Sequence, residues 1–158
     1  MASAPAEGRK APAFTLETTA GKRKLADHAG RWLVLYFYPK DDTPGCTKEA
    51  QDFSAHADAF EAAGASILGI SRDPLPRHEK FAVKYDLAVA LGSDEAGKVS
   101  DAYGTWEEKS MYGRTYMGMA RRTFLIAPDG RIARIWPKVK VAGHAAEVLA
   151  EITERSAV

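Results

Sequence analysis

Residues 32–38 read Trp-Leu-Val-Leu-Tyr-Phe-Tyr, a continuous apolar run that is rich in aromatic and branched side chains. Such a run is typical of a strand buried on both faces, and strands of this kind lie centrally in parallel sheets. Further along the chain, residues 65–71 form a second apolar run of strand length. The two runs predict two buried strands.

The segment between these runs has a helical pattern. From Thr47 to about Ala63, apolar side chains recur at spacings that place them on one helix face, and Gly64 ends the pattern. The order strand, helix, strand predicts a βαβ unit. A second helix near residues 76–85, followed by an apolar stretch at 87–92, continues the alternation, so the fold class is α/β.

The last part of the chain predicts a hairpin and a closing helix. Pro128-Asp129-Gly130 is a turn signal between two strand-like stretches, residues 123–126 and 132–136, which should therefore pair antiparallel. Apolar residues from 145 to 152 follow helical spacing. We predict a central mixed β-sheet flanked by helices on both faces, in a single domain over residues 11–158 after a flexible segment at residues 1–10.

Composition argues against several functions. The charged residues, 27% of the chain, balance to a net charge of +1, so no long-range field attracts nucleic acid or an acidic membrane. We interpret the basic clusters at 22–24 and 131–140 as solvated turn and edge-strand residues. No apolar run approaches the roughly 18 residues of a membrane span, and residues 1–10 lack the apolar core of a signal peptide. We expect a cytoplasmic protein with neither nucleic acid nor membrane as a partner.

Cys46 is the only cysteine of the chain. Alone it can form no internal disulfide and no thiolate metal site, so it is either a small buried hydrophobe or a chemically active residue. It follows the apolar run at 32–38, and open α/β sheets place their sites at the carboxyl ends of such strands. Thr43 and Pro44 are typical of a helix N-cap and first helical residue, which places Cys46 in the first turn.

The helix start favours a reactive thiolate, because backbone N–H groups there lack helical partners and the helix end is positive. Asp41 and Asp42 act in the opposite direction, since nearby carboxylates disfavour a second negative charge. Local spacing alone therefore leaves open an inert, buried Cys46.

The surroundings of Cys46 resemble the active-site signature of the peroxiredoxins. That signature corresponds here to Pro39-x-x-x-Thr43-x-x-Cys46, and the longer stretch YPKDDTPGCTKEA, residues 38–50, is similar to the peroxiredoxin Q branch, also called bacterioferritin comigratory protein. The resemblance continues through residues 121–126 and covers nearly the whole chain. It implies a thioredoxin-like fold with an N-terminal extension.

The resemblance also implies a catalytic role for four residues. Cys46 would be the peroxidatic nucleophile, Thr43 would hydrogen-bond at the sulfur and the peroxide, and Pro39 would shield the pocket and shape the loop. Arg121 is the matching arginine, whose guanidinium would hold the thiolate, align the peroxide and stabilise charge on the leaving oxygen. Neighbouring strand residues point to opposite faces, so of Arg121 and Arg122 only one can face Cys46, and we choose Arg121.

Two further features stay outside this predicted site. Glu49 matches the branch pattern, but a carboxylate in a first helical turn is more often simple compensation of the helix dipole. The aromatic and thioether-rich stretch at 106–119 is interpreted as a packed loop before the arginine strand; as an alternative hypothesis, it forms an apolar collar around the peroxide pocket.

Other cysteine chemistries lack their partners. The histidines, at 28, 56, 78 and 144, are scattered without ligand spacing, so we expect surface positions, no metal site and no cofactor. His56 lies ten residues after Cys46 on the predicted helix, about 15 Å away at helical rise, too far for a general base. The chain has no asparagine and no C-x-x-C, which disfavours a papain-like hydrolase and dithiol exchange.

The resemblance has one departure, the missing resolving cysteine. Attack on a peroxide leaves a sulfenic acid, which a second thiol must capture before it oxidises further. Relatives carry that thiol where this chain has Gln51 or Ala82. We therefore expect a one-cysteine, monomeric thiol peroxidase for hydrogen peroxide and organic hydroperoxides, recycled by thioredoxin, glutaredoxin or a low-molecular-weight thiol. The alternative is a non-enzymatic redox sensor or holdase that uses Cys46 oxidation.

Overall fold

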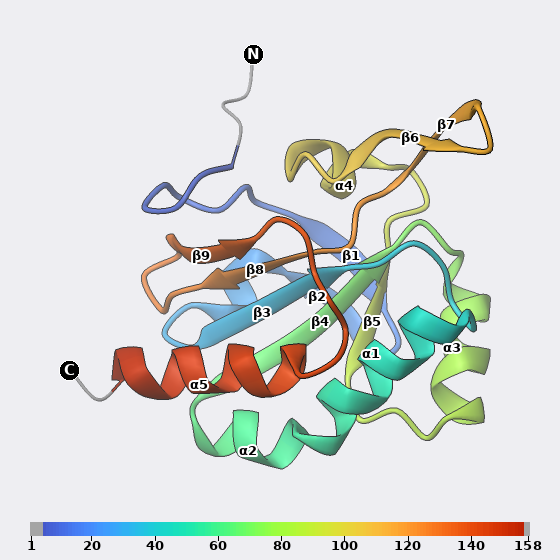
Figure 1. Ribbon diagram of the computed structural model, residues 1–158. Helices are drawn as coiled ribbons and strands as arrows, with labels where there is room; N and C mark the ends of the chain where they lie inside the picture. The colour runs from blue at the N-terminus through green and yellow to red at the C-terminus, as the bar shows by residue number, and fades with distance from the viewer. Residues whose placement is uncertain (1–4, 157–158) are drawn as a thin grey trace.

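A mixed sheet of seven strands forms the centre of the computed structural model, which describes residues 5–156 (Figure 1). The strands are β1 (Thr15–Thr18), β2 (Gly21–Lys24), β3 (Trp32–Phe37), β4 (Ala65–Ser71), β5 (Ala90–Ser93), β8 (Arg122–Ile126) and β9 (Ile132–Trp136). Their order across the sheet is β2-β1-β5-β4-β3-β8-β9. The strands β3, β4 and β5 are parallel, and the flanking pairs are antiparallel.

The helices follow the predicted alternation. They are α1 (Pro44–Ala55), α2 (Ala57–Ala62), α3 (Leu75–Lys84), α4 (Lys98–Ala102) and α5 (His144–Ser156), with a short 3-10 helix, η1 (Leu25–His28). The predicted βαβ unit is confirmed, because β3 and β4 pair in parallel and α1 and α2 connect them. The single helix predicted to end near Ala63 is broken at His56, whose backbone caps α1 and precedes α2. Within residues 5–156, no helix combines the length and apolar character needed to cross a membrane.

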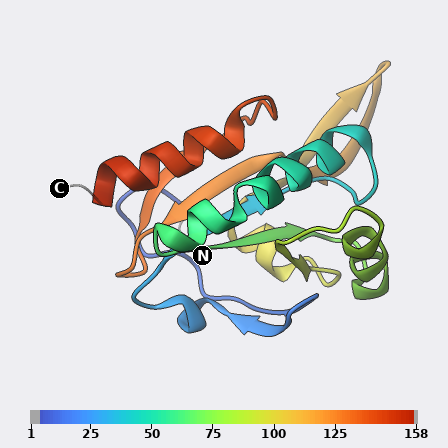
Figure 2. The same ribbon diagram turned by 90° about the horizontal axis from the view of Figure 1, so that it is seen from below.

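Two apolar layers explain the continuous apolar run of β3. Alternate side chains of a strand point to opposite faces of the sheet. Val34 and Tyr36 pack in a cluster with residues of α1 and α5, whereas Leu35 and Phe37 pack in a second cluster with residues of β1 and α4. Figure 2 shows α1 and α5 together on one side of the sheet, opposite the β1–β2 hairpin. Both faces of β3 are covered, so both sets of side chains are apolar.

The predicted C-terminal hairpin is confirmed. Strands β8 and β9 pair antiparallel, with Thr123 opposite Trp136. Part of the segment that we predicted to be flexible lies beside the start of β9. The Gly8 N–H donates to the Ile132 carbonyl at 2.8 Å, and the Ile132 N–H donates to the Arg9 carbonyl at 2.8 Å. Residues 1–4 of that segment lie outside the described residues. The division of the chain at residue 10 stays a prediction.

Our prediction of a packed loop at residues 106–119 is wrong for the outer part of this segment. These residues form a separate hairpin of β6 (Trp106–Met111) and β7 (Arg114–Met119), which projects from the main sheet in both views (Figures 1 and 2). Tyr112 and Gly113 both have positive φ, as the two-residue turn of a tight hairpin requires. The two strands pair with each other rather than with the main sheet, so Tyr112 is 97% exposed, whereas Met119 at the base is buried.

Candidate active site

Cys46 lies in the first turn of α1, where the chain leaves the central strand β3. The predicted helix start is confirmed: Thr43 is the N-cap residue with extended backbone and Pro44 is the first helical residue. The Cys46 side chain is only 1% exposed and belongs to the apolar cluster beneath α1, with Tyr36 and Phe53. The sulfur is therefore buried at the carboxyl end of the sheet, beside a helix N-terminus.

Arg121 lies directly against this sulfur. Strands β3 and β8 are antiparallel neighbours with Phe37 opposite Arg122, so the residue preceding β8 is brought to the end of β3. Arg121 Nη2 donates to Cys46 Sγ at 3.3 Å. Arg122 turns the other way, and its Nη1 donates to the Gly104 carbonyl at 2.8 Å. The structure thus brings the first arginine of the pair to Cys46 and holds the second one elsewhere.

Gly45 leaves room for this approach. A Cβ atom at this position would lie 3.1 Å from Arg121 Nη2, closer than an ordinary van der Waals contact. The glycine before the cysteine therefore allows the guanidinium to reach the sulfur over the first turn of α1.

Glu49, which we left outside the predicted site, belongs to it. The residue is 1% exposed, and its Oε1 accepts a hydrogen bond from Arg121 Nη1 at 2.6 Å. Residues three apart share a helix face, so Glu49 lies one turn below Cys46 and faces the same arginine. The three-residue spacing of Cys46 and Glu49, combined with the arginine expected at the site, was the signal in the sequence that could have identified Glu49 as a site residue. A carboxylate that only compensates a helix dipole would be exposed.

The electrostatics of Glu49 follow from its burial. Loss of hydration raises the pKa of Glu49 to about 7, although the charge and hydrogen bond of Arg121 act in the opposite direction. Its second oxygen, Oε2, is buried and has no hydrogen-bond partner among the described residues. The Glu49 carboxyl group beside Arg121 therefore gains or loses its negative charge near neutral pH.

Thr43 and Pro39 lie in the turn that precedes α1. Thr43 is half-buried, and its hydroxyl donates to the Lys40 carbonyl at 2.8 Å. Pro39 is exposed and follows directly on the buried Tyr38. The structure thus brings Cys46, Glu49 and Arg121 into contact, while the Thr43 hydroxyl is bound within the turn.

The two aspartates that we expected to act on the sulfur face α3. Asp42 accepts hydrogen bonds from Lys84 Nζ at 2.8 Å and from the Tyr85 hydroxyl at 2.6 Å, and these bonds lower the pKa of Asp42. Asp41 is fully buried against Tyr38 and His78. Both negative charges have partners of their own, which weakens the argument that they oppose a thiolate at Cys46.

The expectation that all histidines lie at the surface is wrong for two of them. His78 and His144 are buried. His144 contacts the Thr123 hydroxyl at 2.8 Å and packs edge-on against Phe53 and Trp136. Burial lowers the pKa of His144 to about 4, so this side chain is neutral at pH 7.

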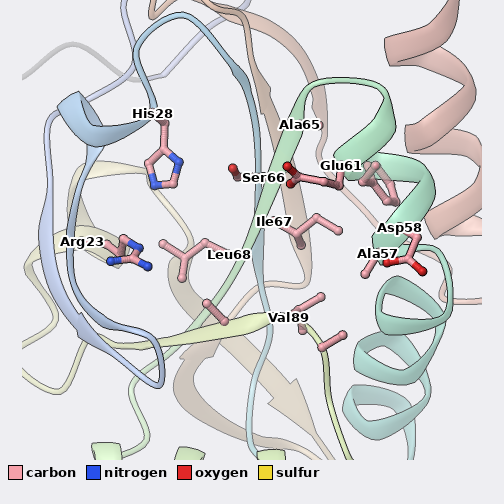
Figure 3. A pocket seen from close by; sticks show the side chains of 13 residues that line it. Arg23, His28, Ala57, Asp58, Glu61, Ala65, Ser66, Ile67, Leu68 and Val89 are labelled. Atoms are coloured by element: carbon pink, nitrogen blue, oxygen red, sulfur yellow. The ribbon is translucent and has the colours of Figure 1, made fainter.

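A separate cavity lies at the other end of β4 (Figure 3). Its volume is about 380 Å³, and the described residues that line it do not include Cys46, Glu49 or Arg121. Figure 3 shows Arg23 and His28 on one side of it and acidic side chains of α2 on the other. This cavity is therefore not part of the cysteine site.

A buried cysteine in the first turn of a helix, held by an arginine at the carboxyl end of a thioredoxin-like sheet, defines the class of protein: a thiol peroxidase. The comparisons with known proteins agree. The model of the AhpC/TSA family matches residues 8–135, and the chain belongs to this family, within its peroxiredoxin Q, or Bcp, branch.

The similar proteins include bacterial peroxiredoxins of this branch. The peroxiredoxin Bcp of Xanthomonas campestris is 50% identical over 81% of this chain and 80% of its own length. The putative peroxiredoxin bcp of Coxiella burnetii is 47% identical over 92% of this chain and 97% of its own. A solved structure of the X. campestris bacterioferritin comigratory protein, described for its alkyl peroxide reduction activity, covers 95% of this chain and 99% of its own at 43% identity, with a TM-score of 0.88.

Proposed function

We propose that Cys46 is the peroxidatic nucleophile of this peroxidase and that Arg121 activates it. The observation that carries the proposal is the 3.3 Å contact between Arg121 Nη2 and Cys46 Sγ at a buried helix N-terminus. A cation and unpaired backbone N–H groups favour the thiolate, which is the nucleophilic form. The same guanidinium stabilises the negative charge that develops on the leaving oxygen.

The chemical step is a displacement at oxygen. The Cys46 thiolate attacks one oxygen of the peroxide, so that an S–O bond forms while the O–O bond breaks. The second oxygen leaves with the bonding electron pair and takes up a proton, which gives water from hydrogen peroxide or an alcohol from an organic hydroperoxide. Sulfur is oxidised to the sulfenic acid and the peroxide is reduced.

Thr43 and Pro39 act on the peroxide side of the sulfur in this proposal. Thr43 is the N-cap residue of the helix that carries Cys46 and lies three residues before it; because its hydroxyl donates to the Lys40 carbonyl, its oxygen accepts a hydrogen bond from the peroxide in this proposal. Pro39 has no N–H and a fixed φ, which restricts the turn between β3 and α1. Both roles rest on the family signature together with these positions.

The substrates are hydrogen peroxide and organic hydroperoxides. The alkyl peroxide reduction described for the X. campestris relative supports the second class. So do the exposed apolar side chains of the β6–β7 hairpin, Met111, Tyr116 and Met117, which stand among charged residues there. Met111 and Tyr116 lie on one face of the hairpin, where they offer a surface for an alkyl group.

An external thiol recycles the enzyme. The chain holds one cysteine, so no second thiol of the same chain can capture the sulfenic acid. A first thiol displaces water and forms a mixed disulfide with Cys46, and a second thiol releases Cys46 and leaves as part of a disulfide. Thioredoxin, glutaredoxin or a low-molecular-weight thiol supplies these electrons.

The protein acts as a cytoplasmic monomer. A reducing compartment maintains both a free cysteine and the thiols that recycle it, which supports the cytoplasm. Cys46, Glu49 and Arg121 all come from one chain, which supports a site that functions without a second copy. Size-exclusion chromatography with light scattering tests the second statement.

Peroxide consumption with dithiothreitol as the reductant tests the proposed function. Turnover should disappear in Cys46→Ser and fall strongly in Arg121→Ala. Arg122→Ala is the matched control, because it removes the neighbouring guanidinium from the other side of the strand and should leave turnover nearly unchanged. Wild-type protein that consumes no peroxide, or equal losses in the two arginine variants, would contradict the proposal.

A further inference from the structure

A buried hydrogen-bonded pair holds the turn that leads to Cys46. Asp41 lies in this turn, five residues before the cysteine, and both its side chain and that of His78 are 0% exposed. His78 Nδ1 lies 2.6 Å from Asp41 Oδ2, and the Tyr38 hydroxyl donates to Asp41 Oδ1 at 2.5 Å. Each oxygen of the carboxylate therefore has a partner inside the protein.

The second nitrogen of His78 fixes the protonation of the pair. His78 Nε2 lies 3.0 Å from the Gly92 carbonyl in β5. A carbonyl oxygen can only accept, so Nε2 carries a proton. Nδ1 faces a carboxylate oxygen, which places a further proton between Nδ1 and Oδ2. The contact is thus a hydrogen bond between two buried groups, and it ties the turn to α3 and β5.

The backbone of Asp41 is held as well. Its N–H donates to Asp73 Oδ2 at 2.9 Å, and its carbonyl accepts from Arg77 Nη2 at 3.2 Å. Asp73 accepts in turn from the Ser71 hydroxyl at 2.6 Å. The next residue, Asp42, has a φ of 59°, a left-handed conformation that is uncommon outside glycine and needs support from its surroundings. The side-chain bonds from α3 to Asp42 provide that support.

A metal ion does not explain this cluster. One ligand atom each from Asp41, Asp73 and His78 lie within 4.8 Å of one another, which is a spacing that a cation could use. These side chains, however, hydrogen-bond to each other, to the backbone and to neighbouring residues, as described above. The cluster therefore has its hydrogen bonds satisfied within the protein.

We propose that His78 is a positioning residue for Cys46: by binding Asp41, it fixes the turn from Tyr38 to Thr43 and so sets where the first turn of α1 holds the sulfur against Arg121. The proposal rests on the peroxidase function with Cys46 as the nucleophile. His78 acts through Asp41 and does not touch the reacting atoms.

The substitutions His78→Gln and His78→Asn test separately the two hydrogen bonds that the His78 ring makes, to Asp41 and to the Gly92 carbonyl. Glutamine can place a donor near the Gly92 carbonyl but loses the bond to Asp41, whereas asparagine can place a donor near Asp41. The readouts are the single-turnover rate constant of Cys46 with hydrogen peroxide and the pH titration of its thiolate by ultraviolet absorbance. We expect His78→Gln to lower the rate constant about tenfold or more, and His78→Asn to stay within about threefold of wild type.

A control separates positioning from stability. Tyr103→Phe removes a hydrogen bond from the Tyr103 hydroxyl to the Pro12 carbonyl, away from the turn, and should lower the unfolding free energy without changing the rate constant. Asp41→Ala removes both hydrogen bonds of the carboxylate, to His78 and to the Tyr38 hydroxyl, so it should lower the rate constant as His78→Gln does. It replaces His78→Gln in the comparison if the latter does not fold.

The outcomes distinguish this proposal from the proposed function. Folded His78→Gln or Asp41→Ala protein with the wild-type rate constant and thiolate titration would overturn the positioning role. Equal losses in His78→Gln and His78→Asn would also overturn it, because they would tie the effect to the ring and not to the Asp41 bond. A wild-type protein without peroxide turnover would instead refute the function on which both proposals rest.

Discussion

Glu49 and Arg121 form a buried ion pair, with Oε1 2.6 Å from Nη1 and the carboxylate only 1% exposed. The other terminal nitrogen of the same guanidinium faces Cys46 Sγ. The carboxylate thus orients the cation that contacts the sulfur, and the planar fork of arginine serves both partners at once.

Glu49 should make the stability of the protein depend on pH. Its pKa in the folded protein is raised to about 7 from an ordinary value of 4.5. The folded state therefore binds more protons than the unfolded state between these values, so stability is fully present below about pH 4.5 and declines as pH rises through about 7. The size of this contribution is roughly 3 kcal/mol.

Urea unfolding of wild type and Glu49→Gln at pH 5 and pH 8 measures this contribution. The decrease in unfolding free energy from pH 5 to pH 8 should be larger in wild type. His144, whose pKa is lowered to about 4, is present in both proteins, so the comparison removes its effect. An identical pH dependence in the two proteins would contradict the raised pKa of Glu49.

Arg121→Lys should show that geometry matters beyond charge. Lysine keeps the positive charge but lacks the two separate donors that reach Glu49 and Cys46. We expect the rate constant with hydrogen peroxide to fall about 10- to 100-fold. Stopped-flow single-turnover kinetics measure it, and a lysine variant as fast as wild type would show that charge alone suffices.

Gly45→Ala should affect the rate more than the stability. The new Cβ would lie 3.1 Å from Arg121 Nη2 and push the guanidinium away from the sulfur by a few tenths of an ångström. We expect a fall of about threefold to tenfold in the peroxide rate constant, with unfolding free energy within about 1 kcal/mol of wild type. Gln51→Ala, on the exposed side of α1, is the control and should change neither quantity. A Gly45→Ala protein with full activity would show that the arginine tolerates the methyl group.

The β6–β7 hairpin should contribute to substrate preference through its exposed side chains. Tyr116→Ala, at a side chain that is 45% exposed, should lower the rate constant for cumene hydroperoxide relative to that for hydrogen peroxide and leave stability within about 0.5 kcal/mol. Met119→Ala is an unsuitable probe, because Met119 is buried and its loss should cost about 2 to 5 kcal/mol. An unchanged ratio of the two rate constants in Tyr116→Ala would remove this face of the hairpin from the substrate site.

Local patterns in the sequence were sufficient to predict the strand and the helix start that support the site. The apolar run at 32–38 predicted β3, and Thr43 with Pro44 predicted the start of α1, because a buried strand and a helix cap are encoded by adjacent residues. The role of Glu49 was missed, since its burial depends on Arg121, 72 residues away. His78 was expected at the surface for a similar reason: its partner Asp41 lies 37 residues earlier, and nothing beside His78 in sequence indicates a buried carboxylate.

Because Cys46 is almost completely buried, the size of the reacting molecule should matter differently for its oxidation by a peroxide and for its reduction by a thiol. If Cys46 is the nucleophile, as we propose, a small peroxide needs little room beside the partly exposed Arg121, whereas the sulfur of another protein would need the first turn of α1 or the preceding turn to move before it could make a bond. The frequency of that opening would then limit how soon the sulfenic acid is reduced by a protein thiol. Interactions that keep this segment closed would therefore favour the oxidising step and prolong the oxidised state, during which further peroxide would inactivate the cysteine.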